Sequence, residues 1–276
     1  MYAAGVLLHA RSAGLFWRVL AYVAVFHFVR QQIGWVSIYR ARAGERDSAG
    51  RWLDHAVIYA ATLYPIAYWH ARFPRSFHWF MDDDFVPWPA LAAALPALGL
   101  VYASLLVVYT AREAWLYRAR GFTSWGKHLV VVTTAALWYV GIVATDDDFT
   151  FTVTNVLGHG VPYAALLWTY TKARAKERPA SFIARVAAAG WIAFVAVILV
   201  IAFAEEALWD RLVWHQRPWL FGGAASDTPL FPSWLRTLVV PLLSVPQATH
   251  YALDAVLWRR KDTGRAQAEA LGFAKA

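Results

Sequence analysis

The chain has 276 residues and few charges for its length: 16% are Asp, Glu, Lys or Arg, whereas 59% are hydrophobic. A soluble domain would carry about a quarter charged residues. Cysteine is absent, which excludes disulfides, thiolate nucleophiles, Fe–S clusters and thiolate metal sites. The net charge of +8 comes from basic residues that lie between apolar runs, so it predicts orientation in a membrane and not nucleic-acid binding.

Apolar runs long enough to cross a bilayer recur along the whole chain. They predict an all-α integral membrane protein, a bundle of about seven transmembrane helices that forms a single polytopic domain over residues 1–276. Residues 259–276 are predicted to be a solvated cytoplasmic tail. The predicted spans are 13–38, 52–71, 89–110, 128–144, 151–170, 182–203 and 235–258.

The distribution of charge predicts how these spans are oriented. Lys and Arg gather in the segments 40–51, 112–127, 172–185 and 259–275, and the alternate loops carry the acidic runs 82–84 and 146–148. Because basic loops stay in the cytoplasm, we expect the N-terminus outside and the C-terminus inside. The Ala- and Arg-rich composition is typical of a bacterium with a GC-rich genome, which favours the bacterial inner (plasma) membrane.

The last predicted span carries a polar stripe. His250 and Asp254 are four residues apart, so they share one helix face, and Gln247 lies one turn earlier on that face. Polar side chains inside a membrane span are costly and usually face a protein interior or a water-filled cavity. This stripe is therefore the strongest local indication of a functional site.

Three other predicted spans carry polar side chains, at helical spacing on the first and fifth spans and as adjacent residues on the second. Counting the rise along each helix, we expect the histidines of the first, second and last spans at depths in the membrane that differ by no more than roughly two helical turns. Polar stripes from several helices can converge to hold a metal ion or to line a polar cavity. The groups are His27 with Arg30 and Gln31 on the first span, Asp54 with His55 on the second, and Asn155 with His159 on the fifth.

Neutral imidazole together with carboxylate is the usual ligand set of zinc and non-haem iron. We therefore expect a His/Asp-ligated metalloenzyme that oxidises a lipophilic small molecule with non-haem iron. Its partners would be membrane lipids, that substrate and an electron donor. The predicted metal ligands are His27, His55, His159, His250 and Asp254, and Asp254, Arg30 and Gln31 form the predicted catalytic set.

A zinc-dependent lipid hydrolase is one alternative, because a bound metal ion can activate water. Seven spans with the N-terminus outside and histidines in several spans resemble, in topology, the alkaline ceramidase and adiponectin-receptor superfamily. That resemblance implies a His-x-x-x-His pair on the last span. This sequence has His250 and Asp254 there, so no site residue is carried over from the family.

Two further alternatives need no catalytic metal. Histidines on different helices could ligate a b-type haem for electron transfer, with His27 and His250, or His55 and His128, as the pairs. In a metal-free transporter or sensor, the polar residues at this depth would line a polar cavity. A microbial-rhodopsin-like retinal protein is disfavoured, because the last span contains no lysine before Lys261 to form a Schiff base.

Overall fold

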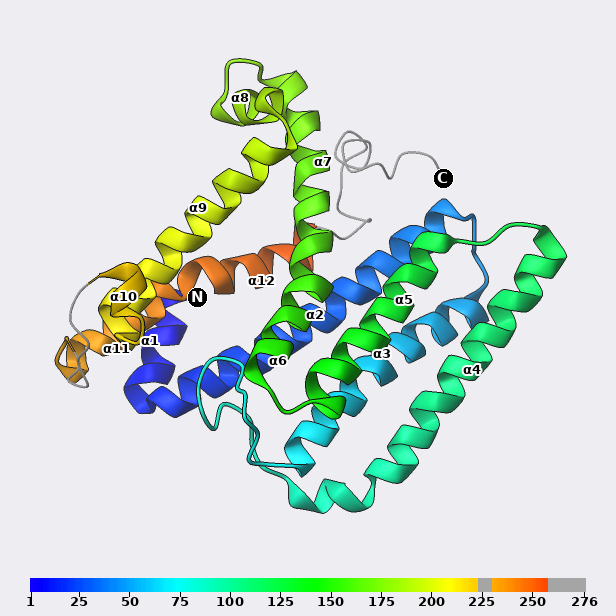
Figure 1. Cartoon of the computed structure of the whole chain (residues 1–276), viewed down its shortest axis with the longest axis horizontal. Coiled ribbons are helices and arrows are strands. Elements are labelled where there is room, and N and C mark those ends of the chain that lie inside the picture. The colour runs from blue at the N-terminus through cyan, green and yellow to red at the C-terminus, as the bar shows by residue number, and fades with distance from the viewer. Residues whose placement is uncertain (223–229, 258–276) are drawn as a thin grey trace. The chain divides into compact units, whose positions relative to one another are not determined.

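A computed structural model describes residues 1–222 and 230–257, with side chains described as far as Leu253. Every regular element in these residues is helical (Figure 1). The α-helices are α1 (Tyr2–Arg11), α2 (Ala13–Arg42), α3 (Ser48–Ala71), α4 (Leu95–Arg120), α5 (Trp125–Trp138), α6 (Asp148–Asn155), α7 (Val161–Glu177), α8 (Phe182–Ala189), α9 (Trp191–Trp209), α10 (Pro218–Phe221), α11 (Ser233–Leu243) and α12 (Val245–Leu257). A 3₁₀ turn, η1 (Pro89–Ala93), and three π segments, η2 (Tyr139–Ala144), η3 (Val156–Gly160) and η4 (Asp210–Trp214), join them.

Four helical stretches in the described residues are long and apolar enough to cross a membrane. They are Ala13–Arg42, Leu95–Arg120, Trp125–Ala144 and Trp191–Trp214. They overlap the first, third, fourth and sixth predicted spans, so the prediction of an all-helical protein with stretches long and apolar enough to span a membrane is confirmed. The count of seven spans and their orientation stay predictions, and the predicted tail 259–276 lies outside the described residues.

The sixth predicted span, 182–203, is two helices instead of one. α8 ends at Ala189, and Gly190 adopts a φ of +93°, which a helix cannot contain and which glycine adopts at little cost. The apolar helix α9 begins only after this break, and η4 extends it to Trp214. The apolar stretch is therefore displaced toward the C-terminus of the predicted span.

The last predicted span, 235–258, is likewise divided. α11 ends at Leu243 and α12 begins at Val245, with Ser244 between them. Pro246 has no N–H to donate to the carbonyl of Leu242, so the regular hydrogen-bond ladder is interrupted here. His250 lies on α12, and the side chain of Asp254 lies outside the described residues.

The described residues form two compact units, Ala21–Ala165 and Met1–Leu20 with Leu166–Leu253. In the first unit α2, α3, α4 and α5 run alongside one another (Figure 1). Apolar residues of all four helices share one buried cluster: Ile33, Val36, Val57, Ile58, Tyr109 and Val131. Side chains that these four helices turn inward can therefore meet one another.

The acidic runs serve as caps in the loops of the first unit. Asp84 accepts a hydrogen bond from the N–H of Phe80 at 2.7 Å. Asp146 accepts one from the N–H of Ser76, also at 2.7 Å, and Asp147 caps the start of α6. These contacts close the aromatic loop between α3 and η1.

In the second unit, the N-terminal segment packs on residues that are distant in sequence. α1 lies against α11, where a Cβ on Gly5 would come within 3.0 Å of Pro241. Three indole rings, those of Trp17, Trp209 and Trp214, gather with centroids 5.3–5.7 Å apart. Aromatic packing therefore joins the start of α2 to the end of α9 within this unit.

Candidate metal centre and the buried ion network

His27 and His159 face each other inside the first unit. His27 lies midway along α2 and is buried, and His159 belongs to the π segment η3. Their ring centroids are 5.1 Å apart, and a ring nitrogen of each lies within 4.8 Å of one on the other. Two nitrogens about 2.1 Å from one tetrahedral zinc are about 3.4 Å apart, so both rings can bind one ion when their nitrogens approach to about that distance.

Gln31 fixes the orientation of the His159 ring. The Nδ1 of His159 lies 2.7 Å from Oε1 of Gln31, and the Gln31 amide nitrogen lies 3.5 Å from the backbone carbonyl of His159. An amide oxygen only accepts, so Nδ1 carries the proton and Nε2 keeps a lone pair. This arrangement, a ring N–H held by an acceptor on the far side, is the usual support of a metal-ligating histidine.

Stacked rings and a second glutamine fix the surrounding backbone. The ring of Phe28 stacks on that of His159 with centroids 4.0 Å apart, and Tyr163 lies parallel at 6.1 Å. Gln32 donates to the carbonyl of Gly158 at 2.9 Å and accepts from the hydroxyl of Thr134. π segments are rare and often occur at functional sites, and here one displaces His159 from the regular helical register.

The other predicted site residues lie elsewhere. Nε2 of His55 is 3.4 Å from the hydroxyl of Ser37, and Arg30 is exposed. His250 belongs to the second unit, and the side chain of Asp254 is outside the described residues. The structure thus brings His27, His159 and Gln31 together, and places His55 in a different contact. Sequence reasoning missed Gln32, although it adjoins Gln31 on the same span.

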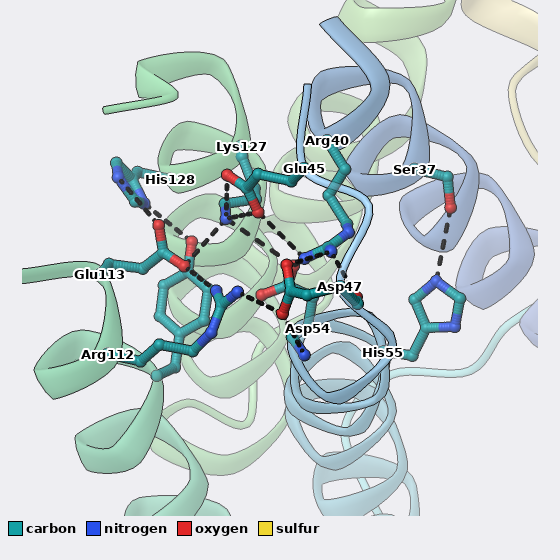
Figure 2. A network of polar contacts seen from close by, with 12 residues as sticks. Ser37, Arg40, Glu45, Asp47, Asp54, His55, Arg112, Glu113, Lys127 and His128 are labelled. Carbon is teal, nitrogen blue, oxygen red and sulfur yellow. Dashed lines mark hydrogen bonds and ion pairs between the residues drawn. The ribbon is translucent and has the colours of Figure 1, made fainter. Parts of the chain in front are cut away.

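Asp54 was expected in the same layer as the histidines. It belongs instead to a buried ion network near the N-terminal end of α3 (Figure 2). The network joins α2, α3, α4, α5 and the turn between α2 and α3. Sequence reasoning placed its basic members only in loops and did not consider its glutamates. Its charged residues are Arg40, Glu45, Asp47, Asp54, Arg112, Glu113 and Lys127.

Lys127 is the centre of this network and has no solvent exposure. Its Nζ lies 2.9 and 2.8 Å from the two carboxylate oxygens of Glu45 and 2.9 Å from Glu113. Arg40 donates to Glu45 at 3.0 Å and also contacts Asp54. Each of these buried charges therefore lies beside an opposite charge from another segment. This pairing offsets the cost of removing the ions from water, which an isolated buried ion would bear in full.

The outer part of the network depends on a glycine. Asp47 caps α3 by accepting from the N–H of Gly50 at 2.7 Å, and it also accepts from Arg112 at 2.8 Å. A Cβ on Gly50 would lie 2.0 Å from Nη2 of Arg112. Only glycine at this position allows the guanidinium of α4 to reach the cap of α3.

His128 closes the network on the side of α4. One ring nitrogen lies 2.8 Å from the hydroxyl of Tyr109, and the other contacts the hydroxyl of Thr123. Both ring nitrogens of His128 thus have protein partners. His128 is therefore a partly buried member of the network, and its ring also lies 3.8 Å from Glu113.

Asp47 predicts an acid-dependent stability. Partial burial would raise the pKa of Asp47, but the Gly50 N–H and the charges of Arg112 and Arg40 lower it to about 2. An aspartate in an unfolded chain titrates near about 3.9. Ionised Asp47 therefore stabilises the fold at any pH above about 4, and this stabilisation is lost as pH falls toward about 2.

The measurement is the difference in Tm between the wild type and Asp47→Asn from pH 6 to pH 2 in detergent. We expect the wild type to be the more stable above about pH 4 and the difference to shrink below it. Asp82, whose side chain is 95% exposed, provides the control substitution Asp82→Asn. A difference that stays constant down to pH 2 would contradict this role for Asp47.

Comparison with protein families, with curated proteins and with solved structures finds no match to this chain.

Proposed function

We propose that this protein is a multi-pass membrane metalloenzyme, and that His27 and His159 bind its metal ion. The observation that carries the proposal is the hydrogen bond from Nδ1 of His159 to Gln31, which directs the lone pair of Nε2 away from the amide. His27 faces this ring, and a ring nitrogen of each histidine lies within 4.8 Å of one on the other. A ring N–H held by an acceptor, with a second imidazole facing the other nitrogen, is the arrangement expected of a metal-ligating histidine and supports the proposal.

The remaining ligands are proposed from the sequence. In the sequence, His250 offers a further ring nitrogen, and Asp254 follows it by one helical turn. Histidines with one carboxylate are the ligand set of non-haem iron oxygenases, and the chain has no thiolate that would favour another metal. We therefore propose iron as the metal and oxidation of a lipophilic substrate as the reaction.

In this proposal the protein residues have distinct tasks. His27, His159 and His250 bind the ion, and Gln31 orients His159 as a positioning residue. Iron would supply the redox chemistry when bound. The burial of His27 and the aromatic cover of Phe28 keep bulk water from the pair. A lipophilic substrate would arrive from the membrane, since the helices that carry the site expose apolar side chains.

The membrane topology completes the proposal. Seven spans with the N-terminus outside would place His27 in the middle of the first span, because α2 extends 14 residues before it and 15 after it. Four candidate spans support a multi-pass protein, and the alternation of basic and acidic loops supports the orientation.

Elemental analysis with an optical spectrum of the full-length protein in detergent tests the function. We expect about one iron per chain and no haem Soret band. Zinc in place of iron would exclude the oxidation and leave metal-assisted hydrolysis. A Soret band would identify a haem protein. Absence of metal in protein never exposed to chelator, and no binding of added Fe²⁺ or Zn²⁺, would overturn the metal centre itself.

A further inference from the structure

A basic pocket lies at the turn between α2 and α3, in the first unit and apart from the histidine pair. Its volume is about 290 Å³, and its lining includes Ser37, Arg40, Arg42, Glu45, Arg46 and Arg51. This volume is at the small end for ligand pockets, which measure about 300–1,000 Å³. The pocket therefore suits a small polar group better than a large organic ligand.

The charge of this pocket is strongly positive. Its one carboxylate, Glu45, is neutralised by Lys127 at 2.8 Å and by Arg40 at 3.0 Å. Arg42, Arg46 and Arg51 are exposed, and within residues 1–222 and 230–253 no acidic side chain pairs with any of them. Three guanidinium groups are thus available to a ligand in a pocket whose other charges are already compensated.

Guanidinium groups bind phosphate oxygens through paired N–H donors, and arginine is the residue that proteins most often use for this geometry. The pocket also lies at the end of α2 that the positive-inside rule assigns to the cytoplasmic surface, where basic pockets beside membrane helices bind anionic headgroups. We propose that this pocket binds a phosphate group. Two sources share this chemistry: the headgroup of an anionic phospholipid and a soluble phosphate compound.

The test uses full-length protein in nanodiscs and follows thermal unfolding by the fluorescence of its 16 Trp residues. One arm compares nanodiscs of phosphatidylcholine with nanodiscs that also contain phosphatidic acid. The other adds inorganic pyrophosphate to phosphatidylcholine nanodiscs. A ligand that binds only the folded state raises the Tm, and the rise grows with the logarithm of ligand concentration above its Kd, so either arm reports binding.

The variant Arg42→Gln/Arg51→Gln removes two of the three arginines. Its matched control is Arg118→Gln/Arg120→Gln, which removes two exposed arginines from the end of α4, predicted on the same membrane side. We expect the pocket variant to bind at least about a hundredfold more weakly, at roughly tenfold for each charge-assisted contact, and the control to bind as the wild type.

Stabilisation by phosphatidic acid alone would identify a lipid headgroup as the ligand, and stabilisation by pyrophosphate in neutral nanodiscs would identify a soluble phosphate. Both results support the site if the pocket variant loses them and the control does not. Equal losses in the two variants would show general attraction to a basic surface and overturn the proposal. No stabilisation of the wild type by either probe would also overturn it.

Discussion

Replacing His27 or His159 with Ala is expected to reduce bound metal to background in the purified protein. Each substitution removes one of the two facing imidazoles from the proposed ligand set, and an incomplete set holds a divalent ion weakly. The measurement is metal content per chain after purification without chelator. His78→Ala is the control, because this histidine is half exposed and pairs with Asp82 at 3.3 Å. Full metal in both single variants would contradict the site.

Three further variants define the rest of the ligand set. His250→Ala should remove the metal if His250 is a ligand as proposed, whereas His55→Ala should leave it, because His55 contacts Ser37. Gln31→Leu should weaken metal binding by about 10- to 100-fold and not abolish it, as expected for a residue that only orients a ligand. Retained metal in His250→Ala, with loss in His27→Ala, would restrict the protein ligands to the first unit.

The sequence was sufficient to predict most helices, because long apolar runs bounded by basic residues leave few other possibilities. It did not predict the breaks. Gly190 and Ser244 interrupt two of the predicted spans, and hydropathy averaged over a window is insensitive to a single residue with an unusual φ or to the N–H that Pro246 lacks. These two helix boundaries therefore follow from backbone geometry, which cannot be inferred from averaged hydropathy.

The histidine pair was partly predictable. The i, i+4 spacing of His27 and Gln31 indicated a polar face on the first span, and the structure uses that face. His55 was assigned to the same layer from its depth in the membrane, and depth does not determine the direction in which a side chain leaves its helix. Because His55 and Asp54 are adjacent, they point to different sides of α3: His55 lies beside Ser37, and Asp54 contacts Arg40 in the ion network.

The ion network was missed because the third span was expected to end at 110. α4 continues to Arg120, and its buried residues Tyr102, Tyr109, Glu113 and Leu116 recur at helical spacing along one face. This periodicity was present in the sequence and places Glu113 on the inward face. Pairing of Glu113 with Lys127, in contrast, depends on the packing of α4 against other helices, which no local pattern encodes.

Lys127→Met is expected to cause the largest loss of stability. Methionine fills a similar volume but carries no charge, so Glu45 keeps Arg40 as a partner, and Glu113 keeps Arg112 together with His128 at 3.8 Å. Breaking a buried ion pair by removing one partner typically costs about 3–5 kcal/mol, because the remaining charge stays buried. For a chain of this size that corresponds to a Tm lower by roughly 6–20 °C.

The substitution Glu113→Gln tests the network further, because we expect it to change the Tm in opposite directions in the wild type and in Lys127→Met. In the wild type it should lower the Tm, because it removes an acceptor of Lys127 at 2.9 Å. In the Lys127→Met background it should raise the Tm, because it removes a buried carboxylate that has lost this partner. Lys176→Met, at the exposed end of α7, should change stability by no more than about 0.5 kcal/mol. Thermal unfolding of these four variants in one detergent measures the effect. If Glu113→Gln changes the Tm in the same direction in both backgrounds, the network does not couple the two residues. If the direction reverses, the charge balance around Lys127 holds α4 and α5 to the turn after α2.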